Sequence, residues 1–109
     1  MHELAITQNV VDAVRERTGD ADVRAVALEI GKLSGVVADS VRFCFELVAE
    51  GTPLERATLT ITEPAGQARC RTCGDEFDVD DLIALCACGS ADITVARGKE
   101  LRVTSVEVR

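Results

Sequence analysis

The sequence predicts an α+β fold, made of a small three-stranded sheet with two helices and an inserted zinc-ribbon-like module. Two stretches carry apolar residues at helical spacing, and three shorter stretches alternate apolar with other residues as strands do. Four of the five cysteines fall between the second and third predicted strands. A strand is not stable alone, so the third must return to the first two. We therefore expect a domain of residues 1–66 and 98–109, with residues 67–97 as a zinc-binding insertion.

The first helix is expected over residues 3–18. Ile6, Val10 and Val14 recur there on one helical face. An acidic residue in the first turn and two arginines in the last suit the helix dipole, and Gly19 offers a stop signal. Together these signals predict an amphipathic helix.

Three strands are predicted from the alternation of apolar residues. The first spans residues 23–30, and the second covers residues 57–61. In the third, over residues 101–108, the alternation changes phase halfway along. An extra residue in one strand of a pair produces such a change, so we expect a bulge near Thr104 or Ser105.

A second helix is expected within residues 39–51, with Asp39 or Ser40 as its cap. Cys44 falls on the apolar stripe of this helix. A buried free cysteine usually behaves as a small hydrophobe, so we assign it to the core. The phenylalanines are likewise expected to be packing residues: Phe43, Phe45 and Phe77.

The cysteines of the insertion form two close pairs. Cys70 and Cys73 are separated by two residues, whereas Cys86 and Cys88 are separated by one. Two such pairs supply four soft ligands, which suit a tetrahedral zinc ion with no open position for a substrate. The sequence therefore predicts a structural zinc site, and the metal should contribute most of the folding free energy of the insertion.

Other uses of four cysteines remain open. Disulfides would need an export route and an oxidising compartment, but residues 1–20 contain neither a basic segment followed by an apolar one nor a membrane span. We therefore expect a cytoplasmic protein that binds metal. Iron in place of zinc would give a rubredoxin-like electron carrier. A zinc-ribbon module that only binds a protein partner is a further alternative.

Charge and composition exclude several classes of function. The formal charge is −7, and acids crowd the cysteine segment, which argues against nucleic acid as a partner and favours a basic protein surface or a cation. A solvated acidic loop is the plainer interpretation. These acids are Asp75, Glu76, Asp78, Asp80 and Asp81. His2 is the only histidine, so a hydrolytic triad is improbable and we expect no enzyme.

The first three residues bring several metal-binding groups together. The Met1 amine, the His2 imidazole and the Glu3 carboxylate are all within reach of one ion. Nitrogen-rich, roughly square-planar coordination favours Ni(II) or Cu(II) over zinc or magnesium. On composition alone, a solvated terminal histidine is the more common interpretation.

Several segments together carry a family resemblance. They are Met1-His2-Glu3-Leu4 opening a helix, Glu29-Ile30-Gly31-Lys32-Leu33-Ser34-Gly35-Val36, Ser40-Val41-Arg42-Phe43-Cys44-Phe45-Glu46, and the paired cysteines. In this order and spacing they resemble the HypA/HybF family of nickel metallochaperones over nearly the whole chain. Cys70 and Cys73 match the zinc ligands of that family directly. Cys86 and Cys88 match by type but not by spacing, because the family usually has two intervening residues.

The resemblance implies a role in delivering nickel. The receivers would be precursors of the [NiFe] hydrogenase large subunit and, in some organisms, urease through a urease accessory protein. A nickel-handling maturation GTPase would be the partner. The family binds Ni(II) through the N-terminal backbone and the second-position imidazole, which correspond here to Met1 and His2. The resemblance implies that Glu3 adjoins the ion and is important for transfer or partner contact.

Overall fold

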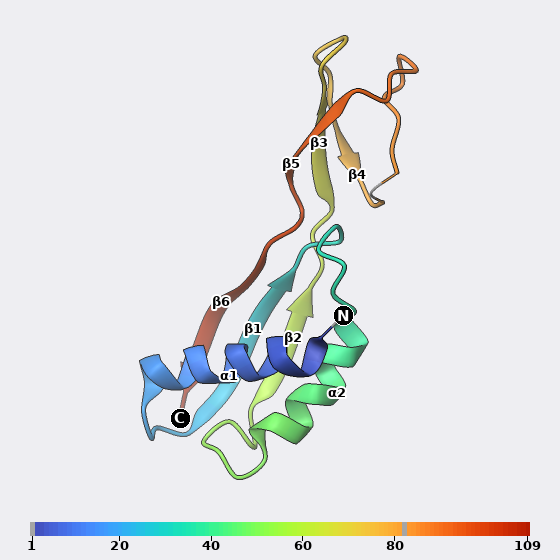
Figure 1. The fold of residues 1–109 in the computed structure, drawn as a ribbon. Helices are drawn as coiled ribbons and strands as arrows, with labels where there is room; N and C mark the ends of the chain where they lie inside the picture. The colour runs from blue at the N-terminus through green and yellow to red at the C-terminus, as the bar shows by residue number, and fades with distance from the viewer. Residues whose placement is uncertain (1, 82) are drawn as a thin grey trace.

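The computed structural model describes residues 2–81 and 83–109 as an elongated molecule of 53 × 22 × 18 Å (Figure 1). Its elements are α1 Glu3–Thr18, β1 Val23–Ile30, α2 Ala38–Ala49, β2 Thr58–Thr62, β3 Gly66–Cys70, β4 Glu76–Val79, β5 Ile93–Arg97 and β6 Leu101–Val108. Over the described residues the strands form two three-stranded sheets, ordered β2-β1-β6 and β4-β3-β5. The predicted α+β fold is confirmed.

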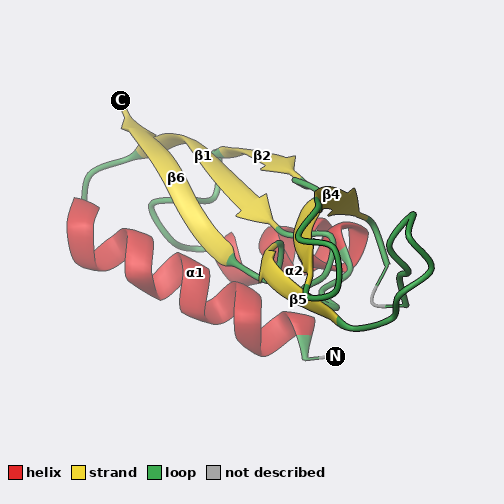
Figure 2. Ribbon diagram, turned by 90° about the horizontal axis from the view of Figure 1, so that it is seen from above, coloured by secondary structure: helices red, strands yellow, loops and turns green. Residues whose placement is uncertain are grey.

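The first sheet carries both helices on one face (Figure 2). Its central strand β1 runs parallel to β2 and antiparallel to β6. Val26, Leu28 and Ile30 alternate along β1 and are each at most 1% exposed, because they lie in the core with the helices. The alternating apolar residues that predicted this strand are therefore those on the face that the helices cover.

The expected bulge in the last strand lies at Thr104. The register between β1 and β6 pairs Ala27 with Ser105 and then Leu28 with Val103, so Thr104 has no residue opposite it. The extra residue changes which side chains of β6 face the core. It allows Val103 and Val106, on either side of the bulge, both to pack against the helices.

The predicted caps of α2 are wrong. The helix starts at Ala38 and its N-cap is Val37, which lies before both Asp39 and Ser40. No side chain of the cap residue closes this end. Instead, the Glu3 carboxylate of α1 accepts a hydrogen bond from the Val37 N–H at 3.3 Å. A contact between two helices thus satisfies the backbone donor of the cap residue, the part that a carboxylate plays in a capping box.

Two further core assignments on α2 are corrected. Phe45 is buried as expected, but Phe43 is 65% exposed and Cys44 is only half-buried. The stripe of α2 that faces the sheet is narrower than the run of apolar residues. Phe43 and Leu47, which lies one helical turn later, therefore form a second apolar stripe that faces away from the sheet.

The second sheet has its own small core. Leu33, from the loop after β1, is 4% exposed and packs with Ala68 and Val79 of this sheet. Three segments meet at the junction between the sheets: the loop after β1 and the connections from β2 to β3 and from β5 to β6. A Cβ atom on Gly31 or Gly66 would overlap neighbouring atoms there, so the absence of these side chains lets the segments approach closely.

Candidate metal centres

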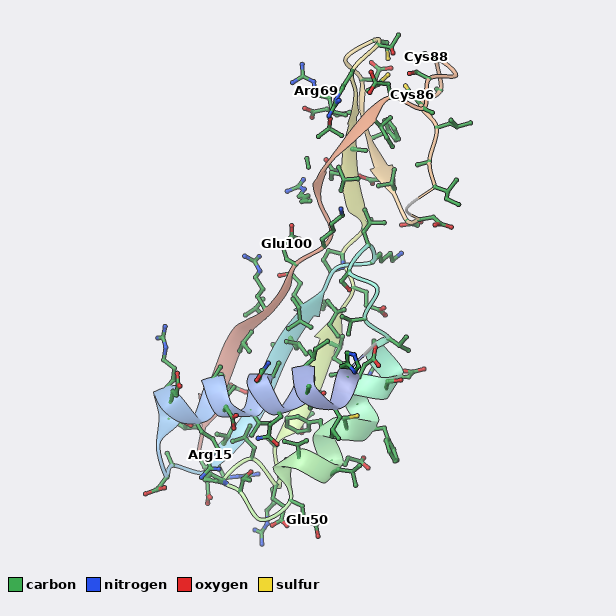
Figure 3. The ribbon with its side chains drawn as sticks, viewed as in Figure 1. Arg15, Glu50, Arg69, Cys86, Cys88 and Glu100 are labelled. Carbon is green, nitrogen blue, oxygen red and sulfur yellow. The ribbon has the colours of Figure 1, made fainter. Side chains whose placement is uncertain are left out.

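The four cysteines of the second sheet lie at one end of the molecule. Cys70 ends β3, Cys73 lies in the following turn, and the other pair lies between β4 and β5. Figure 3 shows Cys86 and Cys88 together at the end remote from the two helices. The fold therefore gathers residues that are up to 18 positions apart in the chain.

Each cysteine pair sits in a tight turn that a glycine closes. After the first pair, the Gly74 N–H donates to the Cys70 carbonyl at 2.9 Å, and after the second, the Gly89 N–H donates to the Cys86 carbonyl at 2.8 Å. Both glycines have positive φ, 82° and 92°, a conformation that glycine adopts without steric cost. The turn that carries the second pair is one residue shorter than the first, as is the spacing of its cysteines.

The four sulfur atoms fit a single tetrahedral ion. They all lie within 4.8 Å of one another, with 3.7 Å between Cys70 and Cys88 and 3.5 Å between Cys73 and Cys86. Zinc–sulfur bonds of about 2.3 Å in tetrahedral geometry place sulfurs about 3.8 Å apart. All five cysteines of the chain are described, and none is joined by a disulfide. The donor set and its geometry suit zinc.

The thiols of this cluster do not lose their protons equally. The Cys73 N–H donates to the Cys70 sulfur and, against the effect of burial, lowers the pKa of Cys70 to about 6. The Asp75 N–H favours the Cys73 thiolate, but the Cys86 thiol and burial outweigh it and raise the pKa of Cys73 to about 12. The pKa of Cys88 is also raised: the Ser90 N–H lowers it, but Cys86 and Cys70 outweigh that contact. A bound dication would displace the remaining protons.

The second candidate centre lies at the start of α1. His2 is its exposed N-cap residue and Glu3 is its first, half-buried residue, while Met1 lies outside the described residues. His2 and Glu3 line an open hollow of about 710 Å³ between the two helices. Asp39 and Cys44 of α2 also line it. This end of α1 is accessible, as a site for metal exchange requires.

Sequence reasoning missed the apolar surface beside this hollow. Leu4 is 56% exposed and Phe43 is 65% exposed, and both line the hollow. Leu47 continues the exposed stripe along α2 and is 54% exposed. Phe43 was expected to be a packing residue and Leu47 was given no role, so the helical spacing of the two was a signal left unused.

Comparison with known proteins identifies the family. Residues 1–108 match the family described as "Hydrogenase/urease nickel incorporation, metallochaperone, hypA". The chain belongs to the HypA family. It is 46% identical over 108 residues to the hydrogenase maturation factor HypA of Nostoc punctiforme, across 99% of this chain and 96% of that one. It is 47% identical over 109 residues to HypA of Geobacter metallireducens, across 99% of each chain.

Solved HypA structures have the same fold. The solution structure of the Ni metallochaperone HypA from Helicobacter pylori matches with a TM-score of 0.70 and 24% identity, across 99% of this chain and 97% of that one. The resemblance inferred from the sequence is thus confirmed, and with it a place among the metallochaperones of hydrogenase and urease maturation. Within the described residues, no helix has both the length and the apolar character needed to cross a membrane.

Proposed function

We propose that this HypA-family protein carries Ni(II) at its N-terminus and delivers it for the maturation of [NiFe] hydrogenase and, in some organisms, urease. The proposed ligands are the Met1 amine, the His2 imidazole and the Glu3 carboxylate. The observation that carries the proposal is that His2 and Glu3 line one open hollow in a chain of a nickel-incorporation family. Nitrogen-rich donors suit Ni(II), and an open site suits transfer.

The four-cysteine centre has a separate role in this proposal. Cys70, Cys73, Cys86 and Cys88 would hold a structural zinc ion, since four thiolates leave no position for a substrate. The zinc would stabilise an inserted domain of residues 67–97, and residues 1–66 with 98–109 would form the nickel-binding domain. The cargo and the structural metal would then occupy separate parts of the molecule, since α1 begins beside α2 and the cysteines lie at the far end of the second sheet (Figure 1).

The proposed setting is the cytoplasm, where thiols stay reduced and available to zinc. The partners would be a nickel-handling maturation GTPase and the hydrogenase large-subunit precursor, with a urease accessory protein where urease is matured. A chain with a charge of −7 is a poor ligand for nucleic acid, so we propose neither nucleic acid nor a membrane as a partner. The protein would transport its metal and catalyse no reaction.

Calorimetry tests the nickel site directly. Ni(II) is titrated into zinc-loaded protein with its native N-terminus, and in parallel into His2→Ala. We expect one nickel per chain in the parent and loss of that binding in the variant, with unchanged zinc content. Equal binding in both proteins, or none in either, would reject the N-terminal carrier and favour a zinc-ribbon interaction module.

A further inference from the structure

At the edge of the first sheet, two hollows lie between α1 and β6. We call the strip of surface between these two elements the seam. In the sheet as described, β6 is an outer strand that pairs only with β1. A helix of 16 residues is about 24 Å long, whereas the outer strands of a three-stranded sheet lie about 10 Å apart. The last turns of α1 therefore extend past β6 (Figure 1). The helical layer is wide enough to cover a further strand.

Two hollows follow this seam and form one groove. One has a volume of about 420 Å³ and the other about 380 Å³, and Ala13 and Val103 line both. Apolar side chains floor the groove: Ile6 and Leu101 lie in the first hollow, and Val106 lies in the second. All three are only half-buried, so apolar surface remains available along the edge of the sheet.

The charged residues that line the groove are all basic, although the whole chain carries −7. Arg102 already pairs with Glu29 across the strands at 2.7 Å. Arg17 and Lys99 are exposed, and neither forms an ion pair with the part of the chain that the structure describes. The two available cations favour an anionic occupant.

We propose that this groove binds an extended acidic segment of a partner protein, which adds to β6 as a fourth strand beneath α1. Strand addition gains affinity from main-chain hydrogen bonds and specificity from alternate side chains. From Lys99 to Val106 the seam follows eight residues, or about 26 Å of extended chain. Apolar side chains of the segment would contact Val103 and its neighbours, and its carboxylates would pair with Arg17 and Lys99.

A second copy of this chain fits the groove less well. The β6 strand of a second copy contains one carboxylate, Glu107, whereas an acidic segment can supply a carboxylate to each of Arg17 and Lys99. Two chains of −7 also repel one another. The groove is separate from the N-terminal nickel centre, so the proposal does not depend on nickel transport.

A random library of ten-residue peptides displayed on phage tests the groove, with the zinc-loaded protein as target. We expect enrichment of sequences that alternate β-branched residues with Asp or Glu. Arg17→Glu should lower the affinity of the protein for an enriched peptide by about tenfold. Arg15→Glu is the matched control, since both arginines lie in the last turn of α1 but Arg15 does not line the groove. It should leave the affinity within about twofold.

Two further readouts separate strand addition from other binding. Methylation of the alternate backbone nitrogens of the peptide that face β6 should abolish binding, whereas methylation of the other alternate set should not. Amide shifts should map to residues 101–106 and to the groove face of α1. No enrichment, enrichment of basic sequences, or equal affinity for the Arg17→Glu and Arg15→Glu variants would overturn the proposal. A dimer of the protein that competes with the peptide would assign the edge to a second copy instead. Nickel titration of the same variants reports on the carrier site independently.

Discussion

The carboxylate of Glu3 accepts a hydrogen bond from the backbone N–H of Val37, with Oε2 3.3 Å from the nitrogen. This contact joins the first residue of α1 to the N-cap residue of α2. In a capping box, a carboxylate within the same helix takes this position. Here the carboxylate comes from another helix, and it belongs to a residue that we propose as a nickel ligand. Glu3 thus belongs both to the proposed nickel centre and to the contact between the helices.

Substitutions of Glu3 should separate these two roles. Glu3→Ala removes the acceptor and is expected to lower the free energy of unfolding by about 1 kcal/mol. Glu3→Gln keeps a carbonyl oxygen at that position and should cost less than half as much, while both variants lose the negative charge beside the nickel ion. Urea unfolding and nickel calorimetry on zinc-loaded protein measure the two effects. Equal stability of the three proteins would show that the contact with Val37 contributes nothing.

Loss of one zinc ligand should unfold the second sheet and spare the first. Cys70→Ser removes a buried sulfur from the cluster. Loss of supporting contacts around a metal already costs about 10–100-fold in affinity, so loss of a ligand should cost more. Cys44→Ser is the matched control, because Cys44 lies outside the cluster. Competition with a chelator gives the zinc affinity, and amide spectra should show that residues 93–97 lose dispersion while residues 23–30 keep it.

Leu33 should be the most costly leucine to truncate at the junction of the sheets. It is 4% exposed and fills the core of the second sheet with Ala68 and Val79. Leu33→Ala is therefore expected to lower the free energy of unfolding by about 2–4 kcal/mol.

Leu47→Ala provides the comparison for this substitution, because Leu47 is 54% exposed on α2 and should change stability by less than about 0.5 kcal/mol. Thermal unfolding of both zinc-loaded variants measures the difference. Similar melting temperatures would mean that the junction is not held by this side chain.

Local patterns predicted the elements well where burial repeats regularly. The alternation in residues 23–30 located β1, and the phase change in residues 101–108 located the bulge at Thr104. The start of α2 could not be read in this way, since its cap interaction comes from Glu3, 34 residues away. No local signal in residues 37–40 reports such a contact.

The candidate sites show the same division between local and distant information. The cysteine pairs indicate a metal site from local sequence alone, because two closely spaced pairs of soft ligands in an intracellular protein are typical of metal binding. The groove along β6 has no motif, because it depends on how far α1 extends beyond the sheet. Its basic residues, Arg17 and Lys99, are 82 positions apart in the sequence, and only the fold places them along one groove, each in a different hollow.

A free N-terminal amine is central to the proposed nickel centre, so extending the chain should impair it. One glycine placed before Met1 moves the amine away from the His2 imidazole, and nickel affinity should fall at least about tenfold. One glycine placed after Arg109 is the control, because the C-terminus lies away from the start of α1 (Figures 1 and 2). Calorimetry of the three proteins measures this, and an unchanged affinity in the protein extended at its N-terminus would exclude the amine as a ligand.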